Sequence, residues 1–432
     1  MNRPGRLWLR IECGLLLSLA LSFSALRQAH GDAQGLGPVA NGALPGPFPL
    51  FPPTNWWNQD VSSAPLDPGS ASFITFINNG GTRRLHPDFG GEVSPGSVQI
   101  YGMPYCVVDG TQPKKAVTFL YSDESDGVNH ATNQSYPFYP IPDEAITQPH
   151  WIEGGEPGNQ DLRSVSDRHL LIVDRDNKYL YELYNVFFDG TGWQAGSGAF
   201  FDMKTDNRRP DGWTSADAAG LAILPGLVRY DEVYGPDEIG HGFRVTVRAT
   251  NGYVYPGSHQ AGSNPQALPM GARLRLKAGV DISSFPPDAQ KIFRALKRFG
   301  LIVADNGSDM FITGSYDDRW NNDVLNPAFA GLTANDFEVV QLGYQGGLPT
   351  PTAAPTLTRT PSFSPTRTPS PTPTRTPSPT RTPTRAATST RTASPTATAR
   401  WTATPTPRRP HRRNRAIAVP FRSSSSLASK ED

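Results

Sequence analysis

Carboxylates, arginines and a histidine gather between residues 202 and 244 of the sequence. The functional candidates there are Asp217, Arg229, Asp231, His241 and Arg244. Carboxylates and an imidazole can pass protons to and from a substrate, and arginines can bind or neutralise an anionic group. Glycoside hydrolysis and uronate elimination both need such a set of side chains. Ion-paired strand ends have the same composition, so a purely structural interpretation stays open.

A further candidate is His169, which opens the run RHLLIVD directly after Asp167. A carboxylate near an imidazole can orient the ring and raise its basicity, as general-base catalysis requires. A histidine at the start of a strand is more often structural, so both interpretations remain. The catalytic candidates are therefore Asp231, His241, His169 and Asp217.

Aromatic and imidazole side chains supply a second kind of candidate. Exposed tryptophan and tyrosine rings offer flat apolar faces on which sugar rings stack. The substrate-binding candidates are Arg229, Arg244, Trp213, Tyr255 and His259. For the aromatic residues, a place in the core or at its rim is the alternative.

Metal and cofactor signatures are not found in the sequence. The 8 histidines are too dispersed to indicate a metal site. No zinc-protease helix motif, nucleophile elbow or phosphate-binding glycine loop occurs. We therefore expect neither a metal nor a cofactor.

The elements that must position these residues are mostly strands. Short β-branched or aromatic runs, bounded by Gly, Asn, Asp and Pro, recur along the chain and are typical of strands. Among them are SVQIYGM, RHLLIVD, KYLYELYNVFF, GLVRY, GFRVTV, ARLRLKA and GLIVAD. In ARLRLKA, Leu274 and Leu276 alternate with charged residues, which is typical of a half-buried antiparallel strand.

Helices are predicted at PGSASFITFINNG and at PPDAQKIFRALKRFG, where apolar residues recur on one helical face and a glycine supplies the stop. The prediction is one mostly β domain over residues 45–345. We expect an antiparallel sandwich or barrel with one or two packed helices. The polar ends of the run GWTSADAAGLAILPGLVRYDEV are expected to converge on one rim of this domain.

Both ends of the chain differ from this domain. Residues 1–33 contain arginines, then the apolar run LLLSLALSF, then small and polar residues, which predicts a secretory signal peptide. Residues 347–432 consist mostly of Thr, Pro, Ser, Ala and Arg, a composition that predicts a disordered stalk or tail. No later run is long and apolar enough for a membrane helix. We expect a secreted or cell-surface protein.

Charge is distributed unevenly along the chain. The tail has 13 Arg and 1 Lys against Glu431 and Asp432, a net charge of +12, while the whole chain carries +1, which leaves −11 for the rest. A basic tail can hold to anionic surfaces by screened electrostatics, or it can simply keep a linker dissolved. The acidic remainder makes nucleic acid an unsuitable partner.

Several longer motifs together resemble a family of secreted bacterial proteins. They include DRHLLIVD, RPDGWTSADAAGL, PGLVRYDEV, PMGARLRLKA and LIVADNGS, spread over roughly residues 52–340. The resemblance implies a single secreted domain. No activity is established for that family, so no catalytic residue is carried over from it.

Two functions agree with these observations. The leading hypothesis is a secreted carbohydrate-active enzyme, a hydrolase or lyase of an extracellular polysaccharide. The alternative is a non-catalytic surface protein that binds glycan or cell-wall material, with the polar clusters serving as scattered ion pairs.

Overall fold

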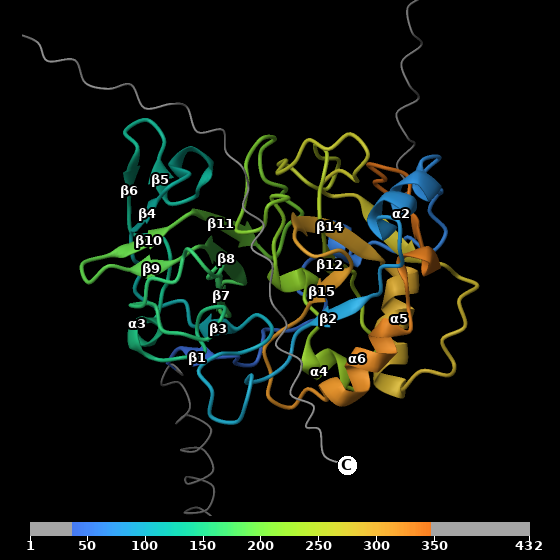
Figure 1. Cartoon of the computed structure of the whole chain (residues 1–432). Coiled ribbons are helices and arrows are strands. Elements are labelled where there is room, and N and C mark those ends of the chain that lie inside the picture. Colours follow the sequence, from blue (N-terminus) through green and yellow to red (C-terminus); the bar gives the residue numbers. More distant parts are fainter. Residues whose placement is uncertain (1–36, 347–432) are drawn as a thin grey trace, which may run out of the picture. The chain divides into compact units, whose positions relative to one another are not determined.

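Two main β-sheets carry the described part of the chain, residues 37–346 of a computed structural model (Figure 1). The five-stranded sheet has the order β1 (Val39–Ala40), β3 (Tyr105–Val108), β7 (Leu170–Asp174), β8 (Tyr179–Tyr184) and β11 (Ser197–Asp202). The six-stranded sheet has the order β16 (Phe337–Val339), β13 (Arg273–Leu276), β14 (Leu301–Asn306), β12 (Phe243–Val247), β15 (Phe311–Thr313) and β2 (His86–Asp88). The predicted signal peptide and tail lie outside the described residues.

Shorter elements surround these sheets. Two small sheets comprise β4 (Val117–Phe119), β10 (Trp193–Ala195) and β9 (Phe187–Phe188), and β5 (Val128–Asn129) with β6 (Gln134–Ser135). The helices are α2 (Ser70–Asn78), α3 (Glu144–Thr147), α4 (Tyr230–Val233), α5 (Pro287–Arg298) and α6 (Asn322–Ala330). Among the described residues, strands therefore outnumber helices, as predicted, and the sheets are open rather than closed into a barrel.

Strand β7 forms the centre of the five-stranded sheet. All of its residues are buried, and it pairs parallel with β3 and antiparallel with β8. Both strands were predicted, and they are joined as a hairpin. Its turn is held by the Asp174 carboxylate, which accepts hydrogen bonds from the backbone N–H groups of Asp176 and Asn177 at 3.1 and 3.0 Å. Such a side chain is typical of a tight turn.

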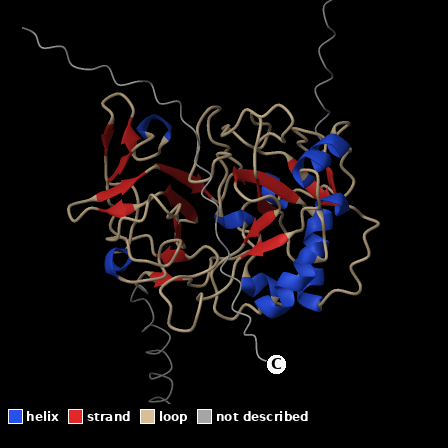
Figure 2. Ribbon diagram, in the orientation of Figure 1, coloured by secondary structure: helices blue, strands red, loops and turns tan. Residues whose placement is uncertain are grey.

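Helices α2, α5 and α6 all pack against the six-stranded sheet (Figure 2). The predicted helices α2 and α5 are both present. Helix α5 begins at Pro287 and buries Ile292, Phe293 and Leu296 in the core against the sheet. Helix α6 was not predicted, because it contains Pro327 and starts in a run of Asn and Asp that is typical of turns.

Three of the strand predictions need correction. Residues 97–103 form only isolated bridges, at Ile100 and Met103. Residues 226–230 join a 3₁₀ turn, η3 (Leu224–Gly226), to helix α4. Strand β13 is not half exposed, because it lies between β14 and β16 and the Arg273 guanidinium is buried against backbone carbonyls, among them that of Phe299.

The segment from Trp213 to Val228 joins the two main sheets. Its Ile223 and Leu227 pack into the core of the five-stranded sheet, whereas Leu221 and Val228 pack into the core of the six-stranded sheet. The backbone N–H of Ala219 also donates to the carbonyl of Ala304 at 2.9 Å. The apolar middle of this run is therefore shared between two cores, which explains why it fits neither a strand nor a helix pattern.

We predict that Phe293→Ala lowers the free energy of unfolding by about 3 to 5 kcal/mol, because the ring is fully buried and leaves a cavity. Arg294→Ala on the same helix removes only a solvent-exposed ion pair with Glu238 and should cost about 0 to 1 kcal/mol. Urea unfolding of both variants measures the two values. Equal losses would contradict the packing of α5.

Candidate functional site

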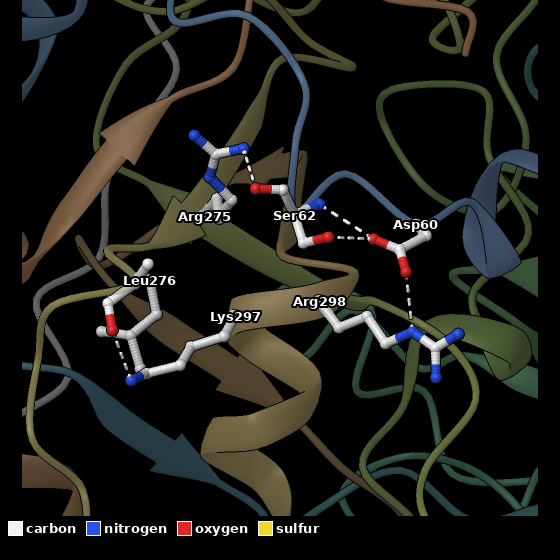
Figure 3. A pocket seen from close by; sticks show the side chains of 7 residues that line it. Asp60, Ser62, Arg275, Leu276, Lys297 and Arg298 are labelled. Atoms are coloured by element: carbon white, nitrogen blue, oxygen red, sulfur yellow. Dashed lines mark hydrogen bonds and ion pairs between the residues drawn. The ribbon is translucent and has the colours of Figure 1, made fainter. Parts of the chain in front are cut away.

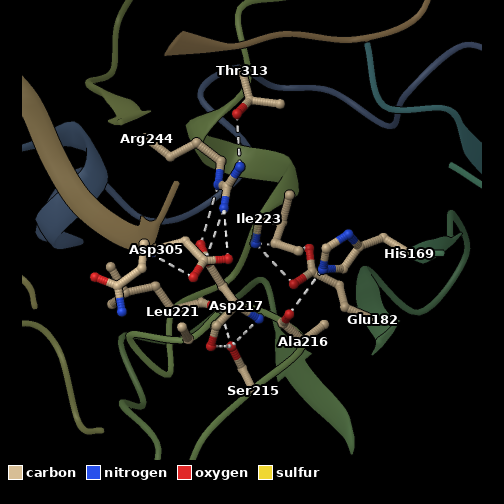
Figure 4. Close-up of polar contacts among 12 residues, drawn as sticks. His169, Glu182, Ser215, Ala216, Asp217, Leu221, Ile223, Arg244, Asp305 and Thr313 are labelled. Carbon is tan, nitrogen blue, oxygen red and sulfur yellow. Dashed lines mark hydrogen bonds and ion pairs between the residues drawn. The ribbon is translucent and has the colours of Figure 1, made fainter. Parts of the chain in front are cut away.

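A buried ion pair between Asp217 and Arg244 lies where the two sheets meet (Figure 4). The Asp217 side chain is fully buried, and Arg244 Nη2 and Nε lie 2.8 and 3.2 Å from its two carboxylate oxygens. Arg244 comes from β12, and its Nη1 donates to the hydroxyl of Thr313 on β15 at 2.7 Å. Hydrogen bonds along two edges of the guanidinium thus hold it in one orientation.

Asp305 lies beside this pair, near the end of β14. Its Oδ2 is 4.0 Å from the same Arg244 Nη2 that binds Asp217, and 26% of its side chain remains exposed. Partial burial and the neighbouring carboxylate of Asp217 raise the pKa of Asp305 to about 7, against the opposing effect of Arg244. Asp305 therefore holds a proton over a pH range in which an ordinary aspartate is ionised.

His169 binds a carboxylate on one side and a carbonyl on the other. Its Nδ1 lies 2.7 Å from Glu153 Oε2, and its Nε2 lies 3.0 Å from the carbonyl oxygen of Ala216. Both neighbours are acceptors, so the geometry fits a doubly protonated imidazolium. Burial opposes that charge, but Glu153 raises the pKa of His169 to about 9, and His169 in turn lowers the pKa of Glu153.

Two more carboxylates adjoin these groups. Asp167 and Asp88 are both exposed at the surface. Crowding by protein atoms and the charge of Glu153 raise the pKa of each, that of Asp88 to about 6. We call the whole set the acid–base cluster, which comprises Asp88, Glu153, Asp167, His169, Asp217, Arg244 and Asp305.

Glu182 supports the cluster from the interior of the five-stranded sheet. It is fully buried on β8, and its carboxylate accepts hydrogen bonds from the backbone N–H groups of Ile223 and Leu224 at 2.8 and 2.9 Å. Burial raises the pKa of Glu182 to about 7 in spite of these bonds. Glu182 fixes the segment that carries Asp217 against the sheet that carries His169 (Figure 4).

The candidates Arg229, Asp231 and His241 belong to a different group of ion pairs. Glu232 binds Arg229 at 2.6 Å and His241 Nε2 at 3.0 Å, whereas Asp231 lies 3.9 Å from Arg229. Burial would raise the pKa of Glu232, but Arg229 and His241 lower it to about 2. Arg229 and His241 are buried, and the ion pairs of this group lie at the start of α4. Of the three candidates in this described group, only Asp231 is exposed and could be reached by a substrate.

The aromatic candidates are separated as well. Trp213 packs beside His130, with ring centroids 5.0 Å apart, and lies under the Arg209 guanidinium. His259 Nδ1 lies 2.9 Å from the carbonyl of Ala218, next to the buried segment that carries Asp217. Tyr255 instead packs edge-on against the buried Trp56. The structure thus brings His169, Asp217 and Arg244 together. Trp213 begins the segment that carries Asp217, and His259 contacts that segment at Ala218.

A separate surface pocket of about 320 Å³ lies between β13 and the end of α5 (Figure 3). Its charged side chains are already engaged. Arg298 binds Asp60 at 2.8 Å, Arg275 binds Glu338, and Lys297 Nζ donates to the carbonyl of Ala278 at 3.0 Å. This pocket therefore offers no free acid or base, and we place the candidate site at the acid–base cluster instead.

The cluster contains residues that the sequence did not single out. Glu153, Asp88 and Asp305 are each followed within two residues by a glycine, which is typical of loops and turns. A signal was nevertheless present. Asp305 directly follows the buried run LIVA, and Glu182 is the one charge in the apolar strand YLYELY, positions at which a carboxylate must be paired or protonated.

Within residues 37–346, no set of His, Cys, Asp or Glu side chains is grouped to hold a metal ion. No helix in the same range is long and apolar enough to span a bilayer. No protein-family model, curated protein or solved structure matches the chain.

We predict that Asp217→Asn and Arg244→Met each lower the free energy of unfolding by about 3 to 5 kcal/mol, because each leaves a buried charge without its partner. The double variant should lose less than the sum of the two by about 1 to 3 kcal/mol. Urea unfolding of the wild type and the three variants completes this double-mutant cycle. Additive losses would show that the two residues do not act as a pair.

The ion pair of His169 with Glu153 should make stability depend on pH. The pKa of His169 is raised from 6.5 to about 9 in the folded state, so its contribution is complete below pH 6.5 and is lost as the pH rises through 9. The pKa of Glu153 is lowered, so its contribution is lost as the pH falls below 4.5. We expect the stability difference between the wild type and His169→Gln, measured by urea unfolding, to be largest between pH 4.5 and 6.5. A difference that is constant from pH 6.5 to 9 would contradict the ion pair.

Proposed function

We propose that the acid–base cluster is the active site of a secreted carbohydrate-active enzyme, a hydrolase or lyase of an extracellular polysaccharide. The observation that carries this proposal is Asp305, a partly exposed carboxyl group whose pKa is raised to about 7. Glu153 in the same cluster has instead a lowered pKa, because His169 stabilises its charge. Two carboxyl groups with opposite protonation states are what acid–base cleavage of a glycosidic bond requires.

Each role in hydrolysis follows from exposure and charge. Asp305 is the general acid and gives its proton to the oxygen of the leaving sugar. Asp167 is the second carboxylate, because it is exposed and its charge is one of those that raise the pKa of Asp305. It takes a proton from the water that attacks the anomeric carbon, so the bond to the leaving oxygen breaks as the bond to water forms.

The buried members of the cluster position these two groups. Arg244 holds Asp217 and lies 4.0 Å from Asp305, so it limits how far the pKa of Asp305 can rise. His169 neutralises Glu153 at 2.7 Å. Only Asp305 and Asp167 contact the substrate in this proposal. Arg244, Asp217 and His169 are positioning residues, which hold these two carboxyl groups in place.

A non-catalytic glycan-binding protein is the second candidate. The observation that favours it is the apolar pair Leu120 and Tyr121, which are 75% and 46% exposed. An exposed aromatic ring of this kind can lie on a sugar face without any chemistry. Retention on an insoluble polysaccharide that Tyr121→Ala loses, with no turnover of any substrate, would favour this candidate.

The ends of the chain suggest where the protein acts. We propose that the leader in residues 1–33 directs secretion and that the arginine-rich residues 347–432 hold the protein near an anionic cell-surface polymer. Both segments lie outside the described residues, and their sequences alone support this part of the proposal.

We predict that Asp305→Asn lowers turnover of a polysaccharide substrate by about 100-fold to 10,000-fold, because the amide cannot donate the catalytic proton. Asp237→Asn changes an exposed carboxylate outside the cluster and should leave turnover unchanged. Reducing ends and the absorbance of unsaturated products, followed on a panel of soluble polysaccharides, measure both variants. Turnover by Asp305→Asn at the wild-type rate would refute the assignment.

A further inference from the structure

A buried arginine of the six-stranded sheet has no carboxylate to neutralise its charge. Arg273 on β13 is only 7% exposed, and its Nη1 donates to the carbonyls of Gln59 and Phe299 at 3.2 and 3.1 Å. Its Nη2 donates to the carbonyl of Trp56. Within residues 37–346, no ion pair joins Arg273 to an Asp or Glu. Burial lowers the pKa of Arg273 to about 10, a shift that the nearby Tyr255 opposes.

The other four buried arginines in the described part of the chain are compensated. Three of them, Arg209, Arg229 and Arg244, each bind a carboxylate, at 2.5, 2.6 and 2.8 Å. Burial lowers the pKa of the fourth, Arg168, but neighbouring acidic side chains oppose this shift. A buried cation without a counter-charge is costly, so Arg273 calls for an anion that the chain itself does not supply.

A small pocket beside Arg273 has room for such a counter-ion. It lies between β13, the loop that contains Tyr255 and the segment that follows β16, and its volume is about 10 Å³. That volume holds one particle of the size of a water molecule, and a halide ion is close to that size. Its lining includes Tyr255, Arg273, Gln341 and Tyr344, and no lining residue is Asp or Glu.

The donors that line this pocket lack acceptors. Among the described residues, Arg273 Nε, the phenols of Tyr255 and Tyr344 and the side-chain amide of Gln341 have no hydrogen-bond partner. The buried indole N–H of Trp56 has none either, and its ring packs edge-on against Tyr255 with centroids 6.3 Å apart. A halide ion only accepts hydrogen bonds, so a surplus of donors beside a cation is suited to it.

We propose that this pocket binds one halide ion, which is chloride in ordinary buffers, and that the ion neutralises Arg273. The ion accepts hydrogen bonds from donors on β13, on the Tyr255 loop and on residues 340–344, and it thereby fastens these three segments together. The proposal does not rest on the proposed function, because no member of the acid–base cluster lines the pocket.

The first test compares urea unfolding of the full chain in chloride and in gluconate at equal ionic strength, because gluconate is too large for the pocket. An ion that binds only the folded state stabilises it by mass action. Above the dissociation constant, each tenfold rise in chloride should therefore lower the unfolding equilibrium constant about tenfold. Bromide should act in the same way. An unfolding midpoint that is equal in chloride and gluconate would overturn the proposal.

Three variants separate a bound ion from a general salt effect. Arg273→Met should abolish the chloride dependence, and Tyr255→Phe, which keeps the ring but loses one donor, should weaken chloride binding by about 3-fold to 10-fold. The control Arg294→Met changes an exposed arginine and should keep the wild-type dependence. Wild-type dependence in either Arg273→Met or Tyr255→Phe would contradict the site, and Tyr255→Phe alone decides if Arg273→Met does not fold.

Discussion

The buried ion pair of Asp217 with Arg244 is the interaction on which the candidate site depends. Arg244 belongs to the six-stranded sheet, and Asp217 to the segment that also packs on the five-stranded sheet. A charge buried without its partner costs several kcal/mol, so neither residue can be displaced alone. The pair therefore fixes the relative position of the two sheets where Asp305 approaches Arg244.

Environment, not residue type, distinguishes the carboxyl groups of this protein. Glu232 has two cationic partners, and its pKa is lowered to about 2. Glu182 has only backbone donors and is fully buried, and its pKa is raised to about 7. Asp305 reaches a similar pKa while a quarter of its side chain stays exposed. Of these three groups, only Asp305 has both a raised pKa and a partly exposed side chain, which is why we propose it as the proton donor.

The sequence predicted the class of fold and part of the site. Short β-branched and aromatic runs identified strands β7 and β8, and the apolar face of residues 287–298 identified α5, because both patterns are local. Local patterns wrongly predicted a strand at residues 226–230, because side chains of that segment pack into two different cores. His169, Asp217 and Arg244 were recognised by type. Their neighbours Glu153 and Asp305 were not, because Glu153 lies 16 residues before His169 and Asp305 comes long after Arg244 in the chain, and spacing in the sequence does not reveal such contacts.

The central claim is that Asp305 holds a proton near neutral pH within reach of solvent. The most direct test is the carboxyl carbon resonance of Asp305, followed by nuclear magnetic resonance over a pH titration and assigned by its absence in Asp305→Asn. We predict a midpoint near pH 7. A midpoint near the ordinary aspartate value of 3.8 would contradict this claim, because Asp305 would then be ionised at neutral pH.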